Sequence, residues 1–488
     1  MEKIHKTVEK KQREIGIVQF GEGNFLRGFV EFMLDIANEK GLTDMSVAVV
    51  KPIAFGSLET FRSQDCVYTV LLRGRQDGKT VEESRVVTCI DHVVDTGSEY
   101  ANYIALAKLG SLRAVVSNTT EAGIVYDETD SLQATPPKSY PGKLTQFLLE
   151  RWKTFNGAAD KGLVILPVEL IEKNGERLHE CVMKLSSLWR LPDAFVAWLN
   201  DSCVFCNTLV DRIITGYPAD DAQSLCEKWG YEDKLIVAGE PFAFWVIESS
   251  KPDIVSALLP LDRAGLPVVF TDNIVPYRER KVRILNGAHT GTVLGAFLAG
   301  IDTVGECMAD ETVRTYLERM MNEEIGPTVP LPKDEVDAFA ASVIERFSNP
   351  FIRHLILSIA LNSVSKWKSR LLPSLLDSKA ATGELPRLLV FSFAALLAFY
   401  TSGEWDGDGL VGKRPAGTYP ILDDKDVLEF FAKNSGLDTD EYVRRTCAHT
   451  AFWGQDLNEI EGFSGMAAGY LKDIRESGAR AAIENALK

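Results

Sequence analysis

A glycine turn between an apolar run and an amphipathic segment is the feature that most constrains the fold of this chain. Residues 15–20 are apolar, Gly21-Glu22-Gly23 follows, and residues 24–40 have the pattern of an amphipathic helix. A dinucleotide-binding βαβ unit requires this order, because glycines close the turn tightly and bring backbone N–H groups against a pyrophosphate at the helix N-terminus. A plain tight turn is the alternative, since the third small residue of the motif is here Leu26. The residues that we expect at the cofactor are Gly21, Gly23, Asn24 and Phe25.

The rest of the first half alternates between strand-like apolar runs and helical patterns. Such alternation predicts a mostly parallel sheet flanked by helices, an α/β fold of the Rossmann-like doubly wound class. The expected strands are 15–20, 46–50, 67–72, 86–94, 113–116, 163–167, 235–238 and 268–270, and the expected helices include 98–109 and 142–153.

The character of the sequence changes after Pro276, where helical patterns follow one another and strand signals nearly vanish. The expected helices are 281–298, 310–322, 333–347, 351–361, 386–400 and 464–487, and the Gly/Asp-rich residues 403–417 are expected to form a surface loop. A chain of 488 residues is too long for one ordinary core. We therefore expect a dinucleotide-binding Rossmann-like domain over residues 1–275 and an all-helical substrate-binding domain over residues 276–488.

Composition narrows the classes of partner. The net charge of −16 argues against nucleic acid, and no apolar stretch approaches the roughly 18 residues of a membrane span. The charged residues 1–14 lack the apolar run of a signal peptide, and the eight scattered cysteines are typical of reduced thiols, so we expect a cytoplasmic protein. Neither Cys203-x-x-Cys206 nor the six histidines have the grouping of a zinc site, and we expect no metal.

The ends of two strands bear on the cofactor. NAD enzymes usually carry Asp or Glu at the end of the second strand to bind the ribose hydroxyls, but this chain has Lys51 there. Lys51 could approach the 2′-phosphate of NADP or be a solvated side chain, so NADP is not excluded on this ground. Asn118 and Glu121 follow the strand at 113–116, where loops approach a nicotinamide, although Glu121 could equally hold the loop in place.

The segment from Lys281 to His289 opens the helical half. At about 100° per residue, Asn286 lies about 140° and His289 about 80° around the helix from Lys281, so all three can line one side at the predicted domain junction. Carbonyl reduction needs a proton donor and a polar group for the developing alkoxide. A lysine can donate if burial and nearby cations lower its pKa, and arginines 278, 280 and 283 could do so. A solvated Lys281 and a core His289 are the alternative.

Lys281, Asn286 and His289 resemble the K-x4-N-x2-H signature of the polyol-specific long-chain dehydrogenases, the mannitol dehydrogenase family. Similar blocks run along nearly the whole chain: 21–27, 117–123, 210–213, 271–273 and 349–350. The resemblance implies NADH as hydride donor and zinc-independent chemistry. It implies that Lys281 is the general acid for reduction and the base in reverse, that Asn286 stabilises the substrate oxygen, and that His289 orients Lys281 or the substrate.

Within the family, the strings QFGEGNFLRGF, SNTTEAGI, NTLVDRIITGYP and KVRILNGAHT are similar to members that act on hexuronates. This implies reversible reduction of tagaturonate to altronate in hexuronate catabolism, by a monomer or small homo-oligomer. A fructuronate reductase or a mannitol-type polyol dehydrogenase is the alternative. One departure is Leu170, which stands where the family often has a second oxygen-binding Asn, four residues before Asn174.

A hexuronate carries a carboxylate, so the substrate site should contain a cationic clamp. The candidates for substrate binding are Arg353, His354 and Lys366, with Lys368 and Arg370 nearby. Lys366 is favoured because residues 362–366 resemble the family's D-G-S-x-K block. An ordinary basic helix surface is the alternative.

Overall fold

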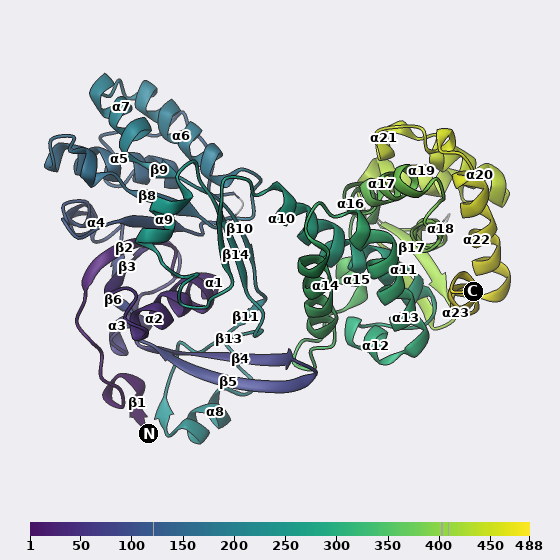
Figure 1. Ribbon diagram of the computed structural model, residues 1–488, viewed down its shortest axis with the longest axis horizontal. Helices are drawn as coiled ribbons and strands as arrows, with labels where there is room; N and C mark the ends of the chain where they lie inside the picture. Colours follow the sequence, from purple (N-terminus) through teal and green to yellow (C-terminus); the bar gives the residue numbers. More distant parts are fainter. Residues whose placement is uncertain (121, 402–403, 408) are drawn as a thin grey trace. The chain divides into compact units, whose positions relative to one another are not determined.

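The computed structural model describes residues 1–120, 122–401, 404–407 and 409–488 (Figure 1). The chain divides into two compact units. Unit 1 comprises Met1–Arg73 and Val81–Ile274, and unit 2 comprises Gly74–Thr80 and Val275–Lys488. Glu121, one of the residues expected at the cofactor, lies outside the described residues. No helix in the described part of the chain has both the length and the apolarity to cross a membrane.

Unit 1 is built on a six-stranded parallel sheet with the order β6-β3-β2-β7-β8-β9. Its strands are β2 (Glu14–Phe20), β3 (Met45–Lys51), β6 (Ile90–Asp95), β7 (Ala114–Ser117), β8 (Val164–Pro167) and β9 (Val204–Phe205). Numbered along the chain, this is the 3-2-1-4-5-6 order of the doubly wound fold, which confirms the predicted fold class. The direction of winding reverses between β2 and β7, and such sheets bind ligands beyond the carboxyl ends of the strands at that point.

Helices cover both faces of this sheet, and successive residues of β2 enter different cores. Ile17 belongs to the core formed with α1 (Asn24–Leu26), η2 (Arg27–Glu31) and α2 (Phe32–Glu39), which follow one another without a break. Val18 and Phe20 belong to the opposite core, beneath the remaining helices of the sheet. Those helices are α4 (Tyr100–Leu106), α5 (Tyr140–Thr154), α6 (Asn174–Leu188) and α7 (Asp193–Ser202) (Figure 1). Burial on both faces explains why the strand sequences are continuously apolar.

Smaller sheets lie mainly in unit 1. They are β10-β14-β15, β11-β13-β4-β5 and β1-β12. Their strands are β1 (Glu2–Lys3), β4 (Tyr68–Gln76), β5 (Lys79–Val87), β10 (Asn207–Asp211), β11 (Ile214–Gly216), β12 (Tyr231–Glu232), β13 (Val237–Gly239), β14 (Phe244–Glu248) and β15 (Val268–Thr271). The other helices of the unit are η1 (Ile4–Lys6), α3 (Glu59–Ser63), η3 (Ala159–Lys161), α8 (Ala222–Trp229) and α9 (Pro252–Leu258).

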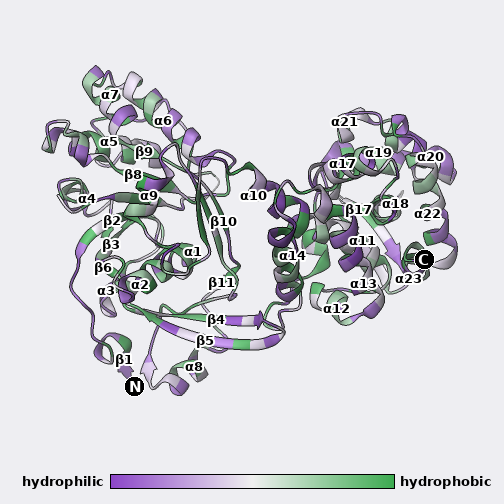
Figure 2. Cartoon of the chain, viewed as in Figure 1, coloured by the Kyte–Doolittle hydropathy of each residue, from purple (hydrophilic) through white to green (hydrophobic). Residues whose placement is uncertain are grey.

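These sheets correct two expectations. The strands expected at 67–72, 235–238 and 268–270 form, but they lie outside the doubly wound sheet. The single strand expected over 86–94 is two strands, the end of β5 and β6, which belong to different sheets. Both hydropathy colours occur along β5 in Figure 2, as suits a strand whose residues are mostly exposed, whereas β4 beside it is largely buried.

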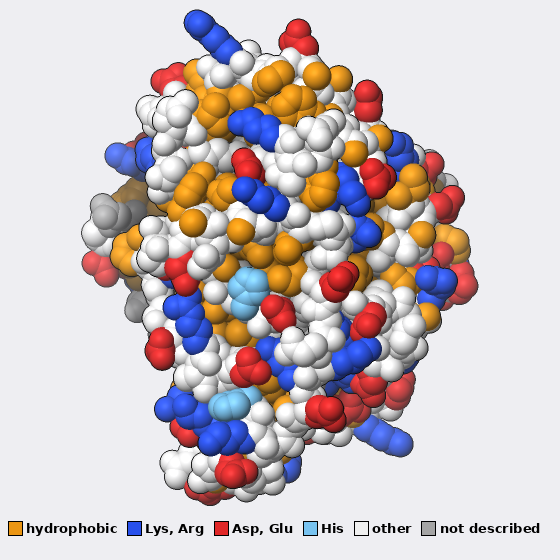
Figure 3. Space-filling model, turned by 90° about the vertical axis from the view of Figure 1, so that its left-hand side faces the viewer, with side chains coloured by type: hydrophobic (Ala, Val, Ile, Leu, Met, Phe, Trp, Pro, Cys, Tyr) orange, Lys and Arg blue, Asp and Glu red, His pale blue; other side chains and the backbone are white. Residues whose placement is uncertain are grey.

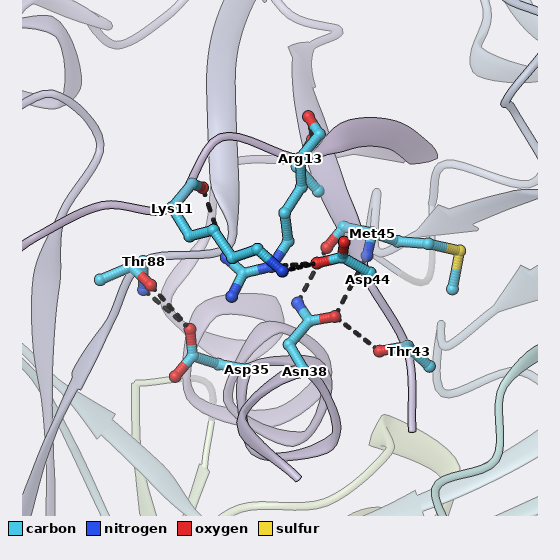
Figure 4. A network of polar contacts seen from close by, with 9 residues as sticks. Lys11, Arg13, Asp35, Asn38, Thr43, Asp44, Met45 and Thr88 are labelled. Carbon is cyan, nitrogen blue, oxygen red and sulfur yellow. Dashed lines mark hydrogen bonds and ion pairs between the residues drawn. The ribbon is translucent and has the colours of Figure 1, made fainter. Parts of the chain in front are cut away.

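A polar network fixes the entry into β3 (Figure 4). The Asn38 amide donates to the Met45 carbonyl oxygen (2.8 Å) and accepts from the Met45 N–H (3.1 Å) and the Thr43 hydroxyl (2.6 Å). Lys11 and Arg13 both contact the Asp44 carboxylate, at 2.8 and 3.1 Å. These bonds hold the start of β3 beside the segment that leads into β2.

Unit 2 is mainly helical. Its first helix runs unbroken through α10 (Val275–Arg280), η4 (Lys281–Asn286) and α11 (Gly287–Leu298). The others are α12 (Val304–Ala309), α13 (Glu311–Arg319), η5 (Met320–Ile325), η6 (Gly326–Thr328), α14 (Lys333–Phe347), α15 (Ile356–Ile359), α16 (Ser363–Arg370), α17 (Leu372–Thr382), α18 (Arg387–Tyr400), α19 (Lys425–Asn434), α20 (Thr439–Cys447), α21 (Thr450–Trp453), η7 (Leu457–Glu459), α22 (Phe463–Ser477) and α23 (Ala479–Ala486). The helix α18 is buried nearly all round and forms the centre of the unit.

The expected loop at 403–417 is wrong, because unit 2 contains a three-stranded antiparallel sheet there. Its strands are β16 (Trp405–Asp406), β17 (Gly409–Arg414) and β18 (Gly417–Ile421). Two helix predictions are also too long. The helix expected over 464–487 breaks at Gly478, whose φ is +83°, and only α15 forms within 351–361.

Charges of both signs are mixed on the face of the molecule that Figure 3 shows. Lys and Arg side chains are interspersed with Asp and Glu over the face drawn in Figure 3, and neither sign dominates that face.

Candidate active site

The glycine turn and Asn118 lie side by side at the switch point of the sheet. Gly21 has a φ of +113°, and a Cβ there would meet the Asn118 carbonyl oxygen at 2.8 Å. The Asn118 N–H donates to the Phe20 carbonyl oxygen at 3.0 Å. A Cβ on Gly23 would meet nothing within 4 Å, and Gly23 is the N-cap of the helix that starts at Asn24. The turn is thus packed against Asn118 at Gly21 and open at Gly23. An open side at a helix N-terminus fits a pyrophosphate held by backbone N–H groups.

The side chains of Asn24 and Phe25 have contacts within unit 1. The Asn24 side-chain oxygen accepts a hydrogen bond of 2.5 Å from Arg27, and Phe25 stacks on Phe29 with ring centroids 5.0 Å apart. Both contacts hold the first turn of the helix against its own core. Asn24 and Phe25 could therefore contact a cofactor through their backbone atoms or through the part of each side chain that stays exposed.

Lys51 is not a solvated lysine. Its side chain is only 1% exposed, and its ammonium lies 2.9 Å from the Asp95 carboxylate and 2.7 Å from the Ile53 carbonyl oxygen. Asp95 is the last residue of β6 and is paired with Lys51 in the sheet register. The lysine at the end of β3 is therefore already committed to two partners inside unit 1.

Lys281 and Asn286 begin and end a π-helical segment within the first helix of unit 2. The Gly287 N–H donates back to the Val282 carbonyl oxygen, five residues earlier. The i→i+5 bonding of a π-helix puts more residues into each turn than an α-helix has, so residue i+5 points nearer to the direction of residue i, and π-segments within α-helices are frequent at functional sites. The two side chains are thus closer to one face than the roughly 140° of an α-helix would place them.

His289 lies one turn further on, in contact with two other rings. It stacks on Phe347 with centroids 3.9 Å apart, and its centroid is 5.3 Å from that of His354. Its Nε2 atom is buried and has no hydrogen-bond partner among the described residues. Burial lowers the pKa of His289 well below its usual range, and the positive charges nearby lower it further. The imidazole is therefore neutral at pH 7.

Basic groups gather around His289. After burial, the largest effects on its pKa come from His354, Arg346, Arg370 and Lys366, in that order. Lys366 donates to the Ile359 carbonyl oxygen (2.9 Å), and Arg370 donates to the Thr290 hydroxyl (3.1 Å). Burial lowers the pKa of both, and Asp423 opposes the shift of Lys366 from outside ion-pair distance. We call His354, Arg346, Arg370 and Lys366 the basic cluster.

The cluster contains two of the three residues expected to bind substrate. His354 and Lys366 belong to it, whereas Arg353 is exposed and is not among the groups that act most strongly on His289. Sequence reasoning missed Arg346, which is buried in the last turn of α14. The sequence does contain a sign of this residue. Arg346 follows Val343 by three positions, so a charged side chain falls on an otherwise apolar helix face, which indicates a buried functional or paired arginine.

The segment after β8 has a structural role. Asn174 is buried and donates to the carbonyl oxygens of Pro167 and Glu169, both at 3.0 Å, while Leu170 is 66% exposed. The Glu169 carboxylate accepts from the Ser117 hydroxyl and the Thr119 N–H. The Asn174 side chain thus holds the turn after β8. No group of three His, Cys, Asp or Glu residues placed to hold a metal ion occurs within the described ranges.

Two family models match the chain. The mannitol dehydrogenase Rossmann domain matches residues 15–257, and the mannitol dehydrogenase C-terminal domain matches residues 273–475. A protein named altronate oxidoreductase from Yersinia enterocolitica is 43% identical over 96% of both chains. A protein of the same name from Pectobacterium carotovorum is 43% identical over 97% of both chains.

Two solved structures have the same fold. A D-sorbitol dehydrogenase in substrate-free form matches with a TM-score of 0.75 at 21% identity, covering 96% of this chain and 95% of the other. Pseudomonas fluorescens mannitol 2-dehydrogenase, in a ternary complex with NAD and D-mannitol, matches with a TM-score of 0.66 at 21% identity, covering 98% and 95%.

Proposed function

The chain belongs to the mannitol dehydrogenase family, and from this premise we propose that it catalyses the reversible, NADH-dependent reduction of tagaturonate to altronate in hexuronate catabolism. The relatives named altronate oxidoreductase match nearly the full length of the chain, which supports altronate as the product. A fructuronate reductase or a mannitol-type polyol dehydrogenase is the alternative.

The basic cluster around His289 is the observation that carries the choice of a hexuronate. Among the described residues, Lys366, Arg370 and His354 make no ion pair with a carboxylate. Lys366 and Arg370 are thus two cations that make no ion pair with a described carboxylate, and in a protein with a net charge of −16 they favour an anionic ligand at that place. The carboxylate of tagaturonate supplies such a charge, whereas mannitol and fructose have none.

We assign the chemistry to three side chains of unit 2. Lys281 donates its ammonium proton to the carbonyl oxygen during reduction, and its neutral amine accepts the hydroxyl proton in reverse. Asn286, one π-turn away, donates an amide N–H to the same oxygen and lowers the cost of its developing charge. His289 is neutral, so its imidazole can hydrogen-bond to Lys281 or to the substrate without adding a further positive charge.

Unit 1 would hold the dinucleotide through Gly21, Gly23 and Asn118, and unit 2 the substrate. When bound, NADH supplies the hydride that reduces the substrate carbon. The proposed domains are residues 1–275 and 276–488, and no metal ion is needed for these steps. A cytoplasmic location and a monomer or small homo-oligomer complete the proposal. The location is supported by the eight cysteines, all of them buried free thiols.

A reduction screen tests the assignment. Tagaturonate, fructuronate and fructose are each offered with NADH and with NADPH, and altronate and mannitol are offered with NAD for the reverse reaction. We expect the highest kcat/KM for tagaturonate with NADH. Mannitol oxidised better than altronate would contradict the hexuronate assignment, and fructuronate reduced better than tagaturonate would establish the alternative within the hexuronates.

A further inference from the structure

Two neighbouring strands of the doubly wound sheet place an ion pair at their carboxyl ends, in which the lysine is buried and the aspartate is partly exposed. Lys51 ends β3, and its ammonium donates to Asp95 (2.9 Å), which ends the outer strand β6. The second oxygen of Asp95 accepts from the Gly97 N–H at 2.8 Å. Burial acts to raise the pKa of Asp95, but the bonds from Lys51 and Gly97 outweigh it and lower the pKa. The carboxylate that is missing from the end of β3 is thus present one strand further out.

Glu22 adds a second carboxylate at this place. It lies in the glycine turn, and a Cβ on Gly56 would be 3.6 Å from the Glu22 carboxylate and 3.8 Å from Cε of Lys51, so the three residues meet. Burial raises the pKa of Glu22, Lys51 lowers it and Asp95 raises it, which places all three charges within reach of one another. Lys51 is therefore close to two acidic side chains, those of Glu22 and Asp95.

This is the part of a doubly wound sheet where the adenosine ribose binds. The acid that bonds the ribose hydroxyls normally stands at the end of the second strand of the fold, which is β3 here. The following loop also exposes Ile53 (57%) and Phe55 (83%), apolar surface of the kind on which a purine ring packs. A lysine at this position would ordinarily indicate a 2′-phosphate. Lys51, however, is buried and already paired.

We propose that Glu22 and Asp95 replace the missing acid at the end of β3, so that the adenosine site selects the 2′-hydroxyl of NADH and rejects the 2′-phosphate of NADPH. Ribose hydroxyls can donate to the carboxylates, whereas a phosphate dianion meets two negative charges while Lys51 is engaged with Asp95. Lys51 acts as the residue that positions Asp95. The inference rests on the proposed NAD-dependent function and adds the source of its cofactor specificity.

Binding measurements without substrate test the proposal. The Kd values of NADH and NADPH, and of ADP-ribose and its 2′-phosphate, are measured for the wild type, Glu22→Gln, Asp95→Asn and the control Glu83→Gln, which removes an exposed acid on β5. We expect the wild type to prefer NADH by more than ten-fold. Each of the two site variants should reduce that preference by about ten-fold, since removal of one repulsive charge is worth at least that much, and the control should leave it unchanged.

The two variants distinguish a loss of folding from a result that contradicts the proposed cofactor selectivity. Asp95→Asn leaves Lys51 buried beside a neutral partner, so thermal unfolding is recorded for every variant. If Asp95→Asn does not fold, Glu22→Gln decides alone, because it keeps the ion pair. A wild type that binds NADPH as tightly as NADH, or an unchanged preference in Glu22→Gln, overturns the inference. A wild type that binds neither nucleotide overturns the dehydrogenase assignment itself.

Discussion

Lys281 and Asn286 are the first and last residues of one π-helical segment. The K-x4-N spacing of the family places these side chains well apart on an α-helix, but i→i+5 bonding brings them over the same face. The π-helical segment therefore accounts for a spacing of five residues between two side chains on the same face of the helix. The widened helix thus favours the proposed action of Lys281 and Asn286 on one substrate atom.

Loss of either side chain should slow the chemical step without weakening cofactor binding. Lys281→Ala should lower kcat by about 10²–10⁴-fold, and Asn286→Ala by about 10²–10³-fold. The Kd of NADH should change little in both, because these residues belong to unit 2. Stopped-flow turnover and NADH fluorescence titration measure the two quantities. Turnover by Lys281→Ala at the wild-type rate would end the mechanism proposed here.

The basic cluster should bind the carboxylate of the substrate, so its loss should weaken the binding of tagaturonate and not that of a neutral ketose. Arg370→Gln removes a charged hydrogen-bond donor, which is worth about 1.5–3 kcal/mol, so KM for tagaturonate should rise by about 10- to 100-fold. Lys366→Ala should have an effect in the same direction. Turnover of fructose, which has no carboxylate, should be nearly unaffected in both variants.

Lys368→Ala is the matched control for these substitutions. Lys368 lies on the same helix, α16, but is not among the groups that act most strongly on His289. It should leave KM for tagaturonate unchanged. Equal losses with tagaturonate and fructose in Arg370→Gln would mean that the arginine supports the fold of unit 2 and does not recognise a carboxylate.

Much of unit 1 could be predicted because its central strands are buried on both faces. Burial on both sides makes β2 and β3 continuously apolar, and the glycine turn marks where the first strand ends. The membership of β4 and β13 in a second sheet could not be predicted, since pairing depends on distant strands and leaves no local pattern. The Gly/Asp-rich composition of residues 403–417 predicts a loop, and the prediction is wrong because Gly and Asp are as common in tight hairpins as in loops.

The parts of the site that escaped sequence reasoning depend on geometry between distant or irregular segments. The π-segment is invisible to an argument that assumes about 100° per residue. The pairing of Lys51 with Asp95 joins residues 44 apart, through the register of β3 and β6. From the sequence alone Lys51 could equally be a phosphate ligand or a solvated side chain, and its burial and its partners are visible only in the structure.

Glu31 should make the stability of the protein fall with rising pH. It is fully buried in η2, where burial raises its pKa to about 7, although hydrogen bonds from Tyr68 and Gln19 and the charge of Arg27 oppose the shift. A carboxyl group with a raised pKa holds a proton in the folded state that it loses in the unfolded state. The contribution of this proton to the free energy of unfolding is complete below pH 4.5. It is lost as the pH rises to about 7, which lowers the free energy of unfolding by about 3 kcal/mol at most.

Glu31→Gln measures this contribution, because glutamine has the same shape and does not titrate. The difference in the free energy of unfolding, wild type minus variant, should decrease between pH 5 and pH 8, as determined by urea denaturation. Glu83→Gln, which removes an exposed carboxylate, should show no such trend. A difference that is constant over this range would mean that Glu31 is ionised in the folded protein.

The two glycines of the turn should fail in different ways when replaced by alanine. Gly21→Ala places a Cβ 2.8 Å from the Asn118 carbonyl oxygen at a φ of +113°, so it should lower Tm and weaken NADH binding together. Gly23→Ala meets no protein atom within 4 Å and should leave Tm nearly unchanged. If the open side of Gly23 is where the pyrophosphate approaches, its new methyl group should still raise the Kd of NADH by about ten-fold or more. Calorimetry and fluorescence titration of both variants measure the two effects, and unchanged NADH binding in Gly23→Ala would place the dinucleotide elsewhere.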